Sequence, residues 1–169
     1  MLAWAHVMKT SPLKTGNKAP AFTLLDQDGE KVSLSGFIGQ WVLLYFYPKD
    51  DTSGCTKEAC AIGAVHPAFE KLDAVILGVS IDSTQSHKKF EAKYKLPFRL
   101  LADTEKKVVE RYGVWGEKSM YGRKYMGTFR MSFLIDPKGK IAKIYHKVKP
   151  EEHAKEVLAD LREMKKATA

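Results

Sequence analysis

Three nearly continuous apolar runs constrain the fold of this chain more than any other feature of its sequence. Each is short, rich in branched or aromatic side chains, and bounded by polar residues, glycine or proline. Such runs are typical of strands whose two faces are both buried, because those strands show no polar alternation. The runs are QWVLLYFYP at 40–48, AVILGVSID at 74–82 and MSFLID at 131–136. We therefore predict a central sheet that is covered on both faces.

Weaker strand patterns and helical patterns fill the rest of the chain. FRLLAD at 98–103 predicts a further strand, and KIAKIYH at 140–146 alternates like an edge strand. The segment 21–37 predicts a small hairpin, because two apolar runs flank the turn-forming residues DQDG. Apolar residues at helical spacing, or helix start and stop signals, mark 56–72, 83–96, 103–114 and 150–166. This order predicts an α/β fold with a mixed sheet flanked by helices.

Length and composition are those of an ordinary globular chain. The 169 residues can form one full hydrophobic core and are too few for two ordinary domains. No repeat, low-complexity tract or linker divides them. We therefore predict a loose N-terminal extension over residues 1–11 and a single domain over residues 12–169.

The balance of charges and the number of cysteines exclude several classes of protein. The net charge is +8, but the lysines are spread along the chain and often lie near acids, so we predict a solvated basic surface and no nucleic-acid partner. No run approaches the roughly 20 apolar residues of a membrane helix. Two cysteines are too few for a disulfide framework, and the first residues lack the layout of a secretory signal. We predict a cytoplasmic protein that neither enters nor binds a membrane.

The segment PKDDTSGCTKEAC at 48–60 contains both cysteines, Cys55 and Cys60. Cys55 falls where a helix is predicted to begin, and the free N–H groups and dipole of a helix start favour a thiolate there. A free cysteine is more often a small buried hydrophobe. The polar, glycine-containing setting of Cys55 argues against that alternative.

Helix geometry limits what the two cysteines can do together. In one regular helix, five residues give a rise of ~7.5 Å and a separation of ~8.5 Å between the two Cα atoms. A disulfide needs less than about 7 Å, so a permanent bridge is disfavoured. Zinc is disfavoured because no second cysteine pair is present and the histidines lack ligand spacing. A redox pair that forms when the helix locally unwinds remains.

Three other residues have properties that suit a reactive thiolate, although each also has a more ordinary role. Pro48 fixes the chain after a strand, or simply ends that strand. The hydroxyl of Thr52 could bond the sulfur of Cys55, or could cap the helix or form a turn. Arg130 precedes an apolar strand, and its charge could stabilise a thiolate and a developing oxyanion, or could lie at the surface.

These residues resemble the active-site signature of the peroxiredoxins, and the second cysteine five positions on resembles the bacterioferritin-comigratory-protein or PrxQ branch of that family. The similarity extends from about Pro12 to the C-terminal helix. One departure is Ser53, where the family commonly has proline. The segments that carry the resemblance are PAFTLLDQDGEKVSL, YFYPKDDTSGCTKEAC, GVWGEK and RMSFLIDPKGKI.

The resemblance implies a thioredoxin-like fold and a thiol peroxidase that reduces hydrogen peroxide and organic hydroperoxides. It implies that Cys55 is the peroxidatic cysteine and Cys60 the resolving one, with Pro48, Thr52 and Arg130 around Cys55. Thioredoxin or a glutaredoxin would be the reductant, and no cofactor or metal is needed. A monomer is expected, because an intrachain pair needs no partner subunit.

Two other functions stay open at this point. A redox sensor or a partner-binding module could use the same fold, since fold does not dictate function. A disulfide oxidoreductase would normally carry a C-x-x-C pair, which this chain lacks.

Overall fold

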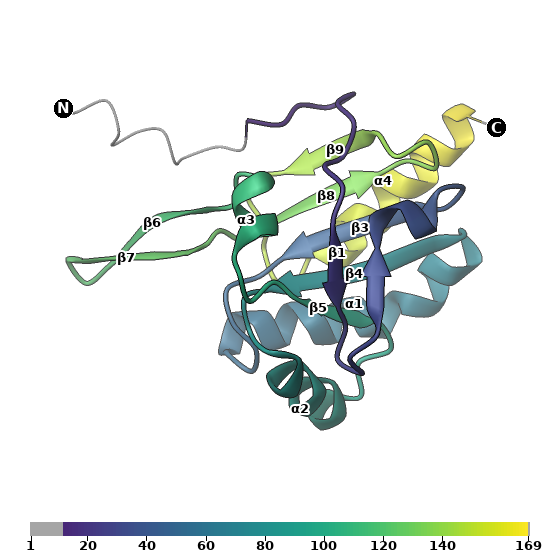
Figure 1. Ribbon diagram of the computed structural model, residues 1–169. Coiled ribbons are helices and arrows are strands. Elements are labelled where there is room, and N and C mark those ends of the chain that lie inside the picture. The colour runs from purple at the N-terminus through teal and green to yellow at the C-terminus, as the bar shows by residue number, and fades with distance from the viewer. Residues whose placement is uncertain (1–11, 169) are drawn as a thin grey trace.

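The computed structural model describes residues 12–168, and in it a seven-stranded mixed sheet forms the centre of the molecule (Figure 1). The strand order is β2-β1-β5-β4-β3-β8-β9. The strands of this sheet are β1 (Thr23–Leu25), β2 (Lys31–Ser33), β3 (Trp41–Phe46), β4 (Ala74–Ser80), β5 (Arg99–Ala102), β8 (Met131–Ile135) and β9 (Ile141–Tyr145). The prediction of an extension over 1–11 concerns residues outside the described ones and stays a prediction.

The predicted α/β class and mixed sheet are confirmed. The two pairs β3–β4 and β4–β5 are parallel, whereas β8, β9 and the β1–β2 hairpin pair antiparallel. All six residues of β3 and all five of β8 are buried, as the apolar runs indicate. The helices are α1 (Ser53–Lys71), α2 (Thr84–Tyr94), α3 (Lys107–Arg111) and α4 (His153–Thr168), with a 3₁₀ turn η2 (Leu34–Phe37) after β2.

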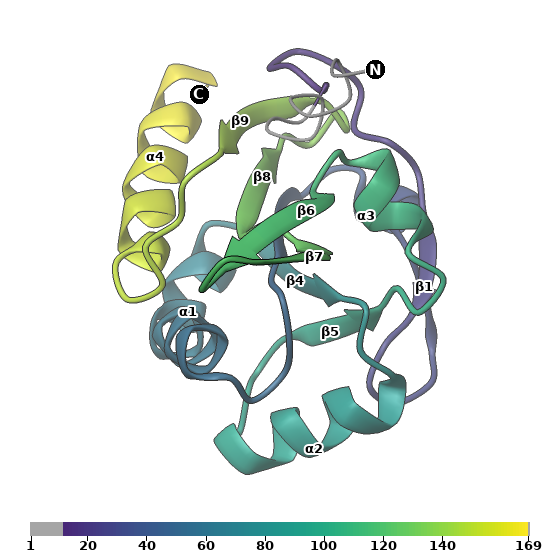
Figure 2. The same ribbon diagram turned by 90° about the vertical axis from the view of Figure 1, so that its left-hand side faces the viewer.

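Two layers of helix cover the sheet. Figure 2 shows α1 and α4 side by side against one face and α3 on the other, with α2 beside β5. The alternate residues of β3 divide accordingly. Leu43 and Tyr45 join the core beneath α1 and α4, and Leu44 and Phe46 join the core beneath α3 and the N-terminal segment. A strand that contributes to both cores must be apolar throughout, which is why the run 40–48 has no polar alternation.

The helix predicted over 103–114 is much shorter in the structure. It begins at Lys107, because the carboxylate of Asp103 accepts the N–H groups of Val108 and Val109 at 3.0 and 2.8 Å and folds the preceding residues into a turn. Lys106 has a left-handed φ of 64° within that turn. Asp103 thus satisfies free N–H groups of the helix from outside it.

The sequence pattern did not predict the hairpin of β6 (Trp115–Met120) and β7 (Arg123–Thr128), which extends from the body of the molecule as a two-stranded arm (Figure 1). Its two-residue turn has positive φ at both positions, 51° at Tyr121 and 77° at Gly122, as a tight hairpin turn requires. The arm leaves large side chains exposed, with Tyr121 98% accessible. Its strands lack the apolar alternation that identifies a half-buried strand, which explains why they were missed.

The contact between Tyr45 and Gly78 offers a test of the packing beneath α1. The two residues are paired across β3 and β4, and a Cβ added to Gly78 would lie 2.9 Å from the buried ring of Tyr45. We predict that Gly78→Ala lowers the free energy of unfolding by about 1–3 kcal/mol, because the ring must leave its packed position. Gly36→Ala is the control, since its Cβ would meet no atom within 4 Å. Urea unfolding of the two variants measures the difference, and equal stabilities would contradict this packing.

Candidate active site

The site lies where the chain leaves β3 and enters α1. β3 ends at Phe46, Pro48 follows, and Thr52 is the residue that precedes the first turn of α1. Cys55 is the third residue of the helix and is only 1% exposed. The predicted position of Cys55 at a helix start is therefore confirmed, and the N–H groups of that turn have no carbonyl partner within the helix.

Arg130 contacts the sulfur of Cys55, although the two residues are 75 positions apart in the sequence. Its Nη2 donates to Cys55 Sγ at 3.3 Å, and its Nη1 donates to Glu58 Oε1 at 2.7 Å. The side chain of Arg130 is 20% exposed and that of Glu58 is fully buried. One planar guanidinium thus donates to two acidic groups that lie one turn apart on α1. A lysine ammonium cannot do this with fixed geometry.

The acid–base state of Glu58 depends on two opposing effects. Burial raises the pKa of Glu58, and Arg130 lowers it by its charge and its hydrogen bond. Burial has the larger effect, so the pKa rises to about 7 from an ordinary value of 4.5. The second carboxyl oxygen, Oε2, has no hydrogen-bond partner among the described residues, which leaves the ionised form poorly solvated. Glu58 therefore changes between its protonated and ionised forms near neutral pH.

Lys118 places a second cation near the thiol. It lies on β6, its Nζ donates to the carbonyl of Thr128 at 2.9 Å, and its pKa is lowered by partial burial and then by the charge of Arg130. The charge of Cys55 raises the pKa of Lys118. The base of the β6–β7 arm thus borders the site and adds positive potential to it.

Sequence reasoning missed Glu58 and Lys118 for different reasons. Glu58 stands three residues after Cys55, on the same side of the helix, and an acid at that spacing in an apolar helix face was a usable signal. Lys118 lies on an arm that the sequence pattern did not predict, so no signal connected it to the cysteine.

The remaining predicted residues lie around the same helix start. Thr52 is exposed, and its hydroxyl donates to the carbonyl of Lys49 at 2.8 Å, which is the turn-forming alternative considered from the sequence. Its oxygen still has lone pairs for a further donor. Pro48 is half-buried between β3 and this turn. Cys55 and Arg130 are thus in direct contact, while Thr52 and Pro48 flank them.

Cys60 lies on the same helix but in a different environment. It is exposed, whereas Cys55 is buried, and both thiols are free. The helix between them is intact, and its first turn is closed by the N–H of Thr56 bonding to the carbonyl of Thr52 at 2.8 Å. Because both cysteines lie in this intact helix, the five-residue spacing keeps them too far apart to form a disulfide.

Two other groups of polar residues have side chains of the kinds that bind ligands. Among residues 12–168, Asp50, Asp82 and His87 bring three ligand atoms close enough to share a metal ion. These atoms already bond one another or nearby groups, since His87 Nδ1 lies 2.7 Å from Asp50 Oδ2 and Asp82 Oδ2 accepts the N–H of Asp50 at 2.9 Å. An ion would have to break these bonds.

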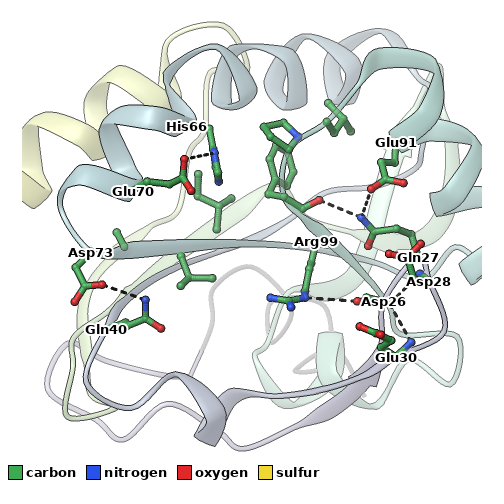
Figure 3. A pocket seen from close by; sticks show the side chains of 16 residues that line it. Asp26, Gln27, Asp28, Glu30, Gln40, His66, Glu70, Asp73, Glu91 and Arg99 are labelled. Carbon is green, nitrogen blue, oxygen red and sulfur yellow. Dashed lines mark hydrogen bonds and ion pairs between the residues drawn. The ribbon is translucent and has the colours of Figure 1, made fainter.

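A separate surface pocket is rich in acids and contains neither cysteine (Figure 3). Its polar groups bond one another, as the close view shows for Arg99 with Asp26 at 3.5 Å and for His66 with Glu70 at 3.5 Å. Gln27 joins the pocket to α2 through Glu91 Oε2 at 2.8 Å, and to the residue before β5 through the carbonyl of Phe98 at 3.2 Å. The bonds of Asp26 and Gln27 hold the β1–β2 turn in place.

The raised pKa of Glu58 predicts a pH-dependent stability. The folded protein keeps a proton on Glu58 up to about pH 7, whereas the unfolded chain loses it near pH 4.5, so the stabilisation is complete below pH 4.5 and is lost as the pH rises to 7. We expect the free energy of unfolding of the wild-type protein to fall by about 3 kcal/mol relative to Glu58→Gln across this window. Urea unfolding at several pH values measures this difference. Parallel pH curves for the two proteins would contradict the shifted pKa.

Comparison with known proteins agrees with this geometry. The AhpC/TSA family model matches residues 15–144. Peroxiredoxin Bcp of Bacillus subtilis is 47% identical over 152 residues, 90% of this chain and 97% of the Bacillus protein. Peroxiredoxin Bcp of Escherichia coli K12 is 46% identical over 90% of this chain and 98% of its own length.

Solved structures give the same result. The bacterioferritin comigratory protein of Xanthomonas campestris, which has alkyl peroxide reduction activity, superposes with a TM-score of 0.83 at 37% identity. The match covers 92% of this chain and 99% of the Xanthomonas chain. Xylella fastidiosa PrxQ superposes with a TM-score of 0.87 at 34% identity, over 92% of this chain and 99% of that one. The fold is therefore thioredoxin-like. A buried cysteine bonded to an arginine at a helix start, together with these similarities, shows that the chain belongs to the AhpC/TSA family, among the Bcp/PrxQ peroxiredoxins.

Proposed function

We propose that the protein is a thiol peroxidase that reduces hydrogen peroxide and organic hydroperoxides at Cys55. The bond from Arg130 Nη2 to Cys55 Sγ at 3.3 Å carries this proposal, because it joins a nucleophile to the group that stabilises its charge. The relatives named above are peroxiredoxins, and one is associated with alkyl peroxide reduction. No cofactor is required for the reaction described below.

The first step oxidises Cys55. Its thiolate attacks one oxygen of the peroxide, an S–O bond forms, and the O–O bond breaks. The leaving oxygen takes a proton and departs as water or an alcohol, and Cys55 becomes a sulfenic acid. Negative charge that develops on the oxygens is stabilised by Arg130 and by the N–H groups at the start of α1. The hydroxyl of Thr52 donates to the carbonyl of Lys49, so its free lone pairs can accept the hydrogen of the peroxide. Pro48 fixes the loop that presents these groups.

The second step joins the two cysteines. The sulfur of Cys60 attacks the sulfenic sulfur of Cys55, an S–S bond forms and water leaves. Since both residues belong to the intact α1, the helix must unwind locally before the sulfurs can meet. Cys60 is already exposed, so the motion chiefly concerns the buried first turn that holds Cys55.

A dithiol protein then restores the two thiols by exchange, and thioredoxin or a glutaredoxin has the chemistry for this. Two thiols that must be re-reduced in every cycle suit a reducing compartment such as the cytoplasm. A monomer is sufficient, since both cysteines belong to one chain. Among residues 12–168, no helix has the length and apolar character needed to cross a membrane.

The roles of the two cysteines are separated by Cys55→Ser and Cys60→Ser. We expect Cys55→Ser to abolish peroxide consumption, because the nucleophile is lost. Cys60→Ser should still consume one equivalent of peroxide per chain and stop at the sulfenic acid. Stopped-flow peroxide assays with mass spectrometry of the product measure both. Rapid consumption of peroxide by Cys55→Ser would refute the proposal.

Arg130→Lys tests the forked contact. Lysine keeps the positive charge but cannot donate to Cys55 and Glu58 from one rigid plane. We expect the second-order rate constant with hydrogen peroxide to fall by roughly 10²–10³, the usual loss when one stabilising donor is removed. Lys143→Arg, a charge-conserving change on β9, is the control and should react at the wild-type rate. A wild-type rate in Arg130→Lys would show that charge alone suffices.

A further inference from the structure

The loop between Pro48 and α1 carries two adjacent aspartates, and both are fastened to α2. Asp50 is buried and Asp51 is exposed. The Asp51 carboxylate accepts from Lys93 Nζ and from the hydroxyl of Tyr94, each at 2.8 Å. Asp51 also adopts a left-handed φ of 58°, which turns the chain so that the two carboxylates reach different parts of α2.

The carboxylate of Asp50 is the centre of the buried part of this attachment. The hydroxyl of Tyr47 donates to Oδ1 at 2.6 Å, and the hydroxyl of Ser86 donates to Oδ2 at 2.8 Å. His87 Nδ1 lies 2.7 Å from the same Oδ2. The N–H of Asp50 itself donates to Asp82 at 2.9 Å. The carboxylate and the N–H of Asp50 are thus bonded to α2 and to the residues that follow β3 and β4.

His87 connects this carboxylate to the sheet. Its side chain is fully buried, and its Nε2 lies 3.0 Å from the carbonyl oxygen of Leu101 on β5. A carbonyl oxygen only accepts, so Nε2 carries a hydrogen. One further proton lies between Nδ1 and Asp50, which makes the pair neutral as a whole whichever atom holds it. A neutral, fully bonded pair is stable in a buried position, whereas either partner alone would be costly.

This pair is connected to the reacting thiol along the chain and through the core. Asp50 is two residues from Thr52, whose carbonyl closes the first turn of α1. Tyr47, which bonds Asp50, stacks on Tyr45 with ring centroids 5.5 Å apart. The pKa of Tyr45 is raised, first by burial and then by the charges of Glu58 and Cys55. Tyr45, Tyr47 and Cys55 belong to the same buried core, so Asp50 is connected to the helix start both through the loop and through this core.

We infer that His87 is a positioning residue for Cys55: by holding Asp50 it fixes the 48–52 loop on α2 and β5, and so fixes the first turn of α1 in the geometry that reacts with peroxide. The inference rests on the proposed function. In the proposed cycle the anchored loop also gives the unwinding helix a fixed start, so that Cys55 returns to the same position after reduction.

Two substitutions of His87 separate its two bonds. The side-chain amide of His87→Asn can occupy the position of Nδ1 and donate to Asp50, but it does not reach Leu101. The longer amide of His87→Gln reaches Leu101 in place of Nε2 and leaves Asp50 without this donor. We expect His87→Gln to lower the single-turnover rate constant with hydrogen peroxide about tenfold to a hundredfold, since a misplacement of about 1 Å has effects of that size. His87→Asn should stay within a few-fold of wild type.

A second measurement distinguishes positioning from a general loss of structure. Trypsin cleaves after Lys49 and Lys57, so Cys55 falls in a peptide of its own, separate from Cys60. Alkylation of Cys55 by iodoacetamide, followed in that peptide, needs a thiolate but not the peroxide geometry. We expect His87→Gln to alkylate as fast as wild type or faster. Asp26→Asn, which alters a buried carboxylate in the β1–β2 turn, is the control and should leave both rates unchanged.

The milder Ser86→Ala keeps the test valid if His87→Gln does not fold. It removes one donor to the same Oδ2, and we expect a several-fold fall in the peroxide rate with no fall in alkylation. Wild-type peroxide rates in His87→Gln, or in Ser86→Ala where only that variant folds, would overturn the inference. Equal losses in His87→Asn and His87→Gln would overturn it as well. If the wild-type protein itself failed to reduce peroxide, the proposed function would be wrong instead.

Discussion

The contact of Arg130 with Cys55 depends on the antiparallel pairing of β3 with β8. That pairing sets Met131 opposite Phe46, so the residue before β8 lies beside the point where the chain leaves β3 for α1. Cys55 and Arg130 are 75 residues apart in sequence, and only the sheet brings them to 3.3 Å. Two buried apolar runs therefore determine the position of the site. Any change that shifts their register by one residue would turn Arg130 to the other face.

A single guanidinium shared by two acids couples their charges. Burial lowers the pKa of Arg130, whereas the charges of Cys55 and Glu58 and the hydrogen bonds to both residues together raise it by more. A protonated Glu58 can still accept the hydrogen bond from Arg130, but of the two groups only the sulfur then attracts the guanidinium by charge. Because burial brings the pKa of Glu58 to about 7, this redistribution falls within the physiological pH range. The buried acid is therefore part of the electrostatics of the thiol, although it does not react.

The sequence was sufficient for the parts of the structure that local patterns determine. The buried strands, the β1–β2 hairpin and the position of Cys55 at a helix start followed from apolar runs, turn residues and helix signals. The contacts among distant residues did not follow. Asp50 and His87 are 37 residues apart, and neither has a local pattern that distinguishes it from a surface residue. The β6–β7 arm was missed because it stands apart from the core and needs no apolar alternation.

The helix that carries the two cysteines has weak local support and strong tertiary support. No side chain caps its start, its first turn contains no acid, and Pro67 inside it provides no N–H for the carbonyl one turn earlier. Its first turns are held instead by burial of Cys55 and Ala59 and by the bonds of Arg130. In the proposed cycle, oxidation turns the thiolate into a neutral sulfenic acid, and the charge attraction to Arg130 is lost. The reaction thus weakens one of the interactions that keep the helix closed, at the moment when Cys60 must reach Cys55.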